Sequence, residues 1–200
     1  MSAATAHPEG AAPPRRRTPW QLWVIAAVSV APLIFSFVAY QLWRPSATTN
    51  HGALLEARAL PDAPLRRVDG SVFRLSELKG KWLLVMADSG SCDAWCDRKL
   101  YTIRQLRLAH GKGAGRIERV WLVTDQAVPA AAALNGYEGT HVARAAGGEV
   151  LAALPAENAV TDHIFIVDPL GNAVLRYGRD AEPSRMIKDI SRLLKASRVE

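Results

Sequence analysis

Cysteine is scarce in this sequence: its 200 residues include only two, Cys92 and Cys96. So few thiols exclude the disulfide framework that supports many small secreted domains. The two cysteines lie four positions apart, a spacing that places side chains on one face of a helix, one turn from each other. Thiols so placed can close a disulfide or chelate one soft metal ion. The pair is therefore a candidate functional site, and two buried structural cysteines are the alternative.

Nucleic-acid-binding features are also lacking. The formal net charge is +6, but the cluster Arg15-Arg16-Arg17 lies in an Ala/Pro-rich tail, and the other basic residues are interleaved with acidic ones. We find no basic stripe and no nucleic-acid motif, and we therefore expect no nucleic-acid partner. No internal repeat is evident, and the length allows one ordinary domain with an appendage.

Charge is lacking altogether between Thr18 and Trp43, where the chain has no Asp, Glu, Lys, Arg or His. About 20 apolar residues can cross a bilayer. Residues 20–43 are therefore predicted to form a transmembrane anchor, and 1–19 a disordered cytoplasmic tail. A cleaved signal peptide is the alternative, but the apolar run exceeds the usual length of about 7–15 residues for such segments, and no convincing cleavage site is present.

Beyond the anchor, residues 44–64 are expected to be a linker and 65–200 a folded domain. Two turn signals, Asp69-Gly70 and the segment 168–172, each separate two strand-like segments. Apolar segments between these hairpins alternate with helix-like segments, and Pro183 opens a last amphipathic helix. This order predicts an α/β fold with a central mixed sheet flanked by helices.

The cysteine pair lies between an apolar strand-like segment, 82–86, and a helix-like segment that extends to about His110. Thioredoxin-like proteins present thiols in this order of strand, loop, cysteine pair and helix. The loop Ser89-Gly90-Ser91 can cap the helix and leave the thiols near its N-terminus. The helix dipole there favours the thiolate, which attacks disulfides and binds metals.

A third candidate residue is His163, which opens the penultimate strand. In thioredoxin-like proteins that strand begins beside the thiol loop and usually carries a proline, which this chain lacks there. A histidine at this place can reach both sulfurs, and a surface loop histidine is the alternative. Two thiolates and one imidazole suit Cu(I), whereas a structural zinc site normally has four protein ligands.

These motifs resemble those of the Sco/SenC family, which are membrane-anchored thioredoxin-like copper proteins. The resemblance covers about residues 60–195. The matching motifs are Cys92-Asp93-Ala94-Trp95-Cys96, Asp125 after the next strand, and Asp162-His163 followed by Asp168-Pro169-Leu170-Gly171. The chain resembles a divergent member, because Asp97 replaces the proline that usually follows the second cysteine and the segment between Asp125 and His163 is short.

The resemblance implies a copper site made by Cys92, Cys96 and His163, with Cu(I) as the bound ion and Cu(II) as the alternative. It also implies a metallochaperone that assists assembly of the copper centre of cytochrome c oxidase, by delivering copper to that centre or by reducing its thiols. The partners would be the oxidase's copper-bearing subunit or other copper chaperones. Two alternatives stay open. One is a membrane-tethered thiol–disulfide oxidoreductase whose redox pair is Cys92 and Cys96 and which needs neither copper nor His163. The other is a degenerate thioredoxin-like interaction module.

The arginine cluster ahead of the anchor predicts the topology. Positive charge is retained on the cytoplasmic side, so the domain is expected in the periplasm of a bacterium, tethered to the inner membrane by one span. An alkaline phosphatase fused after Glu200 should therefore be active. An inactive phosphatase, together with an active cytoplasmic reporter at the same position, would reverse this orientation.

Overall fold

The computed structural model describes residues 20–42, 50–145 and 148–197, and the chain divides into two units, Met1–Ala47 and Thr48–Glu200. The first unit contains helix α1 (Trp20–Leu42), which is exposed along nearly its whole described length. Its segment Trp20–Gln41 has a mean hydropathy of 2.3. This helix is a candidate membrane anchor and matches the predicted span, apart from Trp43, which lies with the predicted tail outside the described residues.

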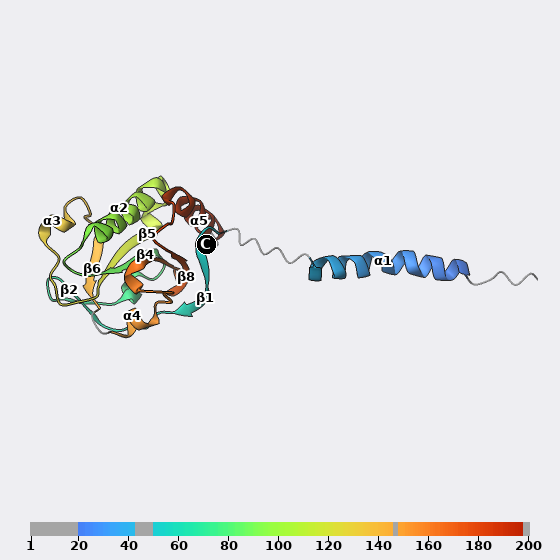
Figure 1. The fold of residues 1–200 in the computed structure, drawn as a ribbon, viewed down its shortest axis with the longest axis horizontal. Helices are drawn as coiled ribbons and strands as arrows, with labels where there is room; N and C mark the ends of the chain where they lie inside the picture. Colours follow the sequence, from blue (N-terminus) through green and yellow to red (C-terminus); the bar gives the residue numbers. More distant parts are fainter. Residues whose placement is uncertain (1–19, 43–49, 146–147, 198–200) are drawn as a thin grey trace, which may run out of the picture. The chain divides into compact units, whose positions relative to one another are not determined.

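The second unit is built on one mixed sheet (Figure 1). Its strands are β1 (Ala53–Ala59), β2 (Leu65–Arg67), β3 (Val72–Phe73), β4 (Trp82–Asp88), β5 (Ile117–Val123), β6 (Thr140–Arg144), β7 (Ile164–Val167) and β8 (Asn172–Tyr177). They lie in the order β1-β8-β7-β4-β5-β6-β2-β3, with β4, β5 and β6 mutually parallel and the other pairs antiparallel. The predicted α/β sheet is confirmed.

Helices cover both faces of this sheet. The helices are α2 (Ala94–Ala109), α3 (Ala131–Leu134), α4 (Glu149–Ala153) and α5 (Pro183–Ala196), with short 3-10 turns η1 (Leu75–Leu78), η2 (Gly111–Arg116) and η3 (Val160–Asp162). One buried cluster joins α2 and α5 to one face, and a second joins α4 to the other face. Strand β4 is buried at every position, because it lies inside the sheet and is covered on both sides.

The segment expected to be a linker, 44–64, contains a strand. Strand β1 pairs with β8, from Ala53 opposite Arg176 to Ala59 opposite Asn172. It forms one edge of the sheet, and six of its seven residues are exposed. An edge strand held by backbone hydrogen bonds needs no alternating apolar pattern, which explains why its sequence gives no strand signal.

A buried carboxylate fixes the start of this strand. Asp189 of α5 is fully buried, and its Oδ2 accepts hydrogen bonds from the amides of His51 (2.7 Å) and Gly52 (3.1 Å) and from the Tyr177 hydroxyl (2.9 Å). Gly52 is required here, because a Cβ atom would lie 2.6 Å from the Tyr177 ring. Asp189 therefore connects the segment that leads into β1 to α5, the last helix of the domain.

Replacing Asp189 with alanine should destabilise the domain by about 3 kcal/mol or more, since each buried donor left without an acceptor costs about 1–3 kcal/mol. Tyr177→Phe removes one of the same bonds and should cost about 1 kcal/mol. Urea denaturation of the full chain in neutral detergent measures both changes, and hydrogen exchange should show faster exchange in β1 than in β4. Equal stability of Asp189→Ala and wild type would contradict this role.

Candidate functional site

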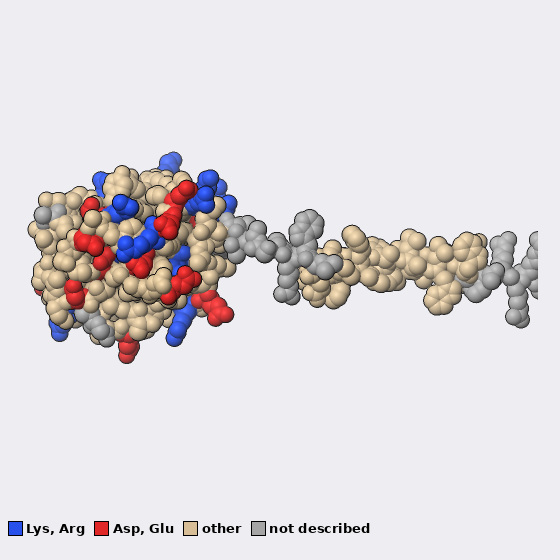
Figure 2. Space-filling view, in the orientation of Figure 1, with Lys and Arg blue, Asp and Glu red and all other residues tan. Residues whose placement is uncertain are grey.

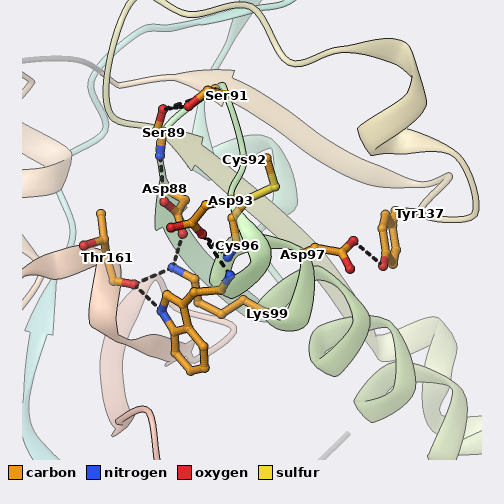
Figure 3. Close-up of a disulfide and its surroundings, with 12 residues drawn as sticks. Asp88, Ser89, Ser91, Cys92, Asp93, Cys96, Asp97, Lys99, Tyr137 and Thr161 are labelled. Carbon is orange, nitrogen blue, oxygen red and sulfur yellow. Dashed lines mark hydrogen bonds and ion pairs between the residues drawn. A yellow bond between two sulfur atoms is a disulfide. The ribbon is translucent and has the colours of Figure 1, made fainter.

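The two cysteines form a disulfide at the N-terminus of α2, with Cα atoms 5.1 Å apart (Figure 3). Cys96 lies in the first turn of the helix and is fully buried, whereas Cys92 precedes the helix and is partly exposed. The pair thus has one accessible and one inaccessible sulfur-bearing residue. Cys92 and Cys96, predicted to act together, thus have the geometry that a redox pair needs.

The helix cap differs from the prediction. Asp93 is the N-cap residue, and its Oδ1 accepts from the amides of Trp95 and Cys96, both at 2.9 Å. The serines of the loop were expected there, but Asp93 lies two and three residues before these free amides, where an N-cap side chain reaches them. The bond from the Cys96 amide, opposed by partial desolvation, keeps the pKa of Asp93 below its usual value. At neutral pH the negatively charged carboxylate of Asp93 therefore lies beside the pair.

Asp125, at the end of β5, positions the loop before the cysteines. Its carboxylate accepts from the Ser89 hydroxyl at 2.5 Å and from the Gly90 amide at 3.0 Å. The Ser89 bond is the main reason why the pKa of Asp125 is lowered. A Cβ atom on Gly90 would lie 2.2 Å from the Ala127 carbonyl oxygen, so only glycine fits. Asp125 thereby attaches the loop to the end of β5, and α2 begins directly after the loop.

The backbone of Cys92 is strained. Its φ is +47°, and it is the only residue other than glycine with positive φ in the described part of the chain. Left-handed conformations cost an L-residue free energy unless the surroundings hold them. Here the Cys92 amide donates to the Ser89 carbonyl at 3.2 Å, and the side chain is tied to Cys96.

A buried ion pair, which the sequence did not suggest, lies beneath the cysteine pair. Lys99 of α2 is 1% exposed, and its ammonium is 2.7 Å from Asp88 Oδ2. It also donates to the carbonyl oxygens of Ala87 (2.8 Å) and Thr161 (2.5 Å). Burial lowers the pKa of Lys99, and the bond to Asp88 opposes this effect. Lysine in a helix is usually exposed, so the only signal was its position three residues after Cys96.

Trp95, between the cysteines, adds a second bond to the same carbonyl. Its Nε1 donates to Thr161 O at 3.0 Å, and the Arg179 guanidinium lies 4.9 Å from the ring centroid. Arg179 also forms an ion pair with Asp162 at 2.7 Å. The turn η3 is therefore fastened to the N-terminal part of α2 by two side chains, the buried Lys99 and the half-buried Trp95.

His163 does not lie with the cysteines. It is 5% exposed, and its ring packs edge-on against Phe165 with centroids 5.8 Å apart. Phe165 belongs to the cluster on the α4 face, whereas Ile164 and Cys96 belong to the cluster on the α2 face. Side chains alternate along a strand, so the imidazole is on the face of the sheet opposite Cys96.

This arrangement does not fit a three-ligand copper site. Within residues 20–42, 50–145 and 148–197, no three His, Cys, Asp or Glu side chains are grouped to hold a metal ion. Both ring nitrogens of His163 are buried without a hydrogen-bond partner. His163 is not a histidine of a surface loop either, which was the alternative to a metal ligand, because the residue is buried.

A mixed sheet between two helical layers, with a cysteine pair at the start of α2 and a loop held by the adjacent strand, defines a thioredoxin-like protein. Residues 82–197 match a family described as "Transmembrane-like, thioredoxin-like, C-terminal domain", and this chain belongs to that family. No curated protein matches the chain by sequence.

Similar solved structures include two copper-bound proteins and an oxidoreductase. Yeast Sco1 with copper bound has a TM-score of 0.57 at 17% identity, covering 71% of this chain and 96% of its own. Bradyrhizobium japonicum ScoI with copper bound has 0.51 at 19%, covering 68% and 99%. The thioredoxin domain of a thiol-disulfide oxidoreductase from Bacteroides vulgatus has 0.52 at 16%, covering 71% and 99%. The predicted resemblance to Sco/SenC proteins is thus confirmed as a likeness of fold.

The buried imidazole of His163 should make stability depend on pH. Burial, and secondarily the charge of Arg176, lowers the pKa of His163 below 6.5. As pH falls through 6.5, the unfolded chain binds a proton before the folded one, so the free energy of unfolding decreases until the folded-state pKa is reached. His163→Leu should lose less stability than wild type between pH 7.5 and about pH 5.

Urea denaturation of the full chain in detergent at several pH values measures this difference. The control His51→Leu also removes one histidine, but an exposed one whose hydrogen bond to Asp189 uses only its backbone. Parallel pH curves for wild type and His163→Leu would contradict the prediction.

Proposed function

We propose that this protein is a membrane-tethered thiol–disulfide redox protein whose Cys92–Cys96 pair cycles between dithiol and disulfide. The observation that carries this proposal is the disulfide at the N-terminus of α2, with one partly exposed and one buried cysteine. In thiol–disulfide exchange the accessible thiolate attacks first and the inaccessible thiol resolves the intermediate. The order of attack therefore follows from exposure.

The exchange balances without copper. The Cys92 thiolate attacks one sulfur of a partner disulfide, and the other partner sulfur leaves as a thiolate that takes up a proton. Cys96 then loses its proton and attacks the Cys92 sulfur, which closes the protein disulfide and releases the second partner thiol. The partner gains two electrons and the protein loses two. The reverse sequence oxidises a partner dithiol.

The surrounding charges act in opposite directions on the thiols. The N-terminus of α2 favours a thiolate, whereas the carboxylate of Asp93 disfavours it. Lys99 and Asp88 lie close together as a buried pair and so compensate each other's charge. These residues keep the loop and η3 in place while the sulfurs exchange.

An oxidising compartment suits this chemistry. A disulfide persists in the periplasm, where the arginine cluster and the apolar helix are expected to place the domain. The candidate anchor would hold the domain at the inner membrane, within reach of membrane-bound partners.

Copper delivery is the second proposal. Reduced Cys92 and Cys96 would carry one Cu(I) as cargo for the copper-bearing subunit of cytochrome c oxidase or for another chaperone, since two soft thiolates select Cu(I). The Cys-x-x-x-Cys spacing and the likeness of fold to two copper-bound structures support it. His163 would join as a third ligand only if its ring moved to the other face of the sheet.

Alkylation of the full chain in neutral detergent tests the redox pair. The reduced protein should accept one label, at the partly exposed Cys92, under native conditions and two labels after denaturation, whereas the oxidised protein should accept none, because a disulfide has no free thiol. Cys96→Ser should accumulate a mixed disulfide with oxidised glutathione, since the attacking Cys92 remains but the resolving thiol is missing. Cys92→Ser should form little adduct, because its remaining thiol is buried. Native thiols that both resist alkylation would identify two structural cysteines instead.

Anaerobic competition with a Cu(I) chelator on the same reduced proteins separates the two proposals. A copper carrier should retain Cu(I), and Cys92→Ser and Cys96→Ser should lose it, because oxygen is a harder ligand than sulfur. In the arrangement described, His163→Leu should retain copper like the wild type. Equal copper retention by wild type and Cys96→Ser would exclude this copper site and leave the redox function intact.

A further inference from the structure

The pairing of β2 with β6 places two arginines side by side. Arg66 and Arg144 are directly opposite each other in this antiparallel pair. Opposed residues point to the same face of a sheet, and like charges in this position are destabilising. Neither arginine forms an ion pair within the described residues, and Arg144 donates only to the Gln126 carbonyl at 3.2 Å. Two cations are thus held together without a compensating anion.

The neighbouring arginine on β2 is different. Arg67 is 3.4 Å from Glu77 and lies 4.3 Å from the centroid of the Phe73 ring. Its charge is therefore used within the fold, as expected for a structural arginine. The contrast indicates that the unpaired charge of Arg66 and Arg144 has another use.

Both unpaired arginines line a groove of about 130 Å³, which also contains Val68, Val128 and Pro129 and which we call the arginine groove. None of the residues that line it is acidic. Val68 and Val128 are 52% and 65% exposed, and Val72, opposite Arg66 on β3, is 57% exposed. Exposed valines around unpaired arginines are suited to a ligand that is both apolar and anionic.

The arginine groove is continuous with the thiol loop. Ala127 lines the groove, and its amide donates to Asp125 Oδ1 at 3.1 Å. The same oxygen accepts from the Gly90 amide at 3.0 Å. The Ala127 carbonyl also lies against Gly90, where no side chain would fit. A chain bound in the groove would therefore lie next to the loop that leads into Cys92.

We propose that the arginine groove binds an acidic segment of the redox partner, in which carboxylates face Arg66 and Arg144 and an apolar residue packs on the exposed valines. The proposal rests on the proposed redox function and adds how a partner is chosen. A groove of limited volume bordered by the thiol loop suits a side chain of a polypeptide better than a flat lipid surface. Charge complementarity at such a site mainly raises the association rate.

Three peptides test this groove. Each carries one cysteine as a 2-thiopyridyl disulfide, a leucine, and a pair of glutamates, glutamines or lysines, and the released pyridine-2-thione reports exchange with the reduced full chain in neutral detergent. The glutamate peptide should react roughly tenfold faster than the glutamine peptide at low salt, as expected for two exposed charge pairs, and the difference should shrink as salt rises.

Variants of the groove give the second readout. Arg66→Glu should reverse the order, so that the lysine peptide reacts faster than the glutamate peptide. Arg144→Lys keeps the charge and should retain most of the preference. Lys112→Glu is the matched control for Arg66→Glu, because it makes the same change of charge at η2, beyond the other end of α2 from the disulfide, and it should leave the preference unchanged.

Fluorescence anisotropy measures binding of cysteine-free versions of the peptides. It separates the groove proposal from the proposed redox function, because these peptides can bind but cannot exchange. Acidic binding that depends on Arg66, without any exchange, would overturn the redox function and support the groove. Equal binding and equal rates for acidic and neutral peptides would overturn the groove, whatever the thiols do. Loss of the preference in inorganic phosphate, but not in chloride of the same ionic strength, would identify a small-anion site and overturn binding of a segment.

Discussion

The ammonium of Lys99 joins the three parts of the molecule on which the cysteine pair depends. It connects α2, which carries Cys96, to the end of β4 and to the turn η3. The ammonium donates to two carbonyl oxygens, and the carboxylate of Asp88 at 2.7 Å compensates its charge. Removing one member of a buried ion pair costs about 3–5 kcal/mol, because the other charge is left uncompensated. The disulfide therefore lies on a rigid support whose strength comes from electrostatics in the protein interior.

Much of the fold follows from local patterns in the sequence. The apolar segments predicted strands β4, β5 and β7, the turn signals at Asp69-Gly70 and 168–172 predicted both hairpins, and Pro183 marked the first residue of α5. Strand β1 could not be predicted in this way, since an exposed edge strand is specified by backbone pairing with β8, which leaves no periodic pattern in its side chains. The start of the folded domain was accordingly expected too late in the chain.

The site was only partly visible in the sequence. Cys92 and Cys96 are four residues apart, so local geometry alone brings them together. The relation of His163 to them depends on which face of the sheet each residue occupies. One position along a strand exchanges these faces, so a motif such as Asp162-His163 cannot specify its partners without the register of β7. The burial of Lys99 could not be predicted for a related reason. It depends on how α2 packs onto the sheet, which the sequence of the helix does not specify.

The left-handed backbone of Cys92 makes the two cysteines differ in how firmly the fold holds them. Cys96 belongs to a packed helix and keeps its place in either redox state. Cys92 is kept in an unfavourable conformation partly by the bond to Cys96, so reduction releases it to sample ordinary backbone angles while its partner stays still. In the proposed redox cycle this release is confined to Cys92, because Asp125 still holds Ser89 and Gly90, and closing the disulfide returns Cys92 to one conformation. In that cycle the partner leaves as a dithiol when the protein disulfide closes, so release of the reduced partner coincides with the loss of this local freedom.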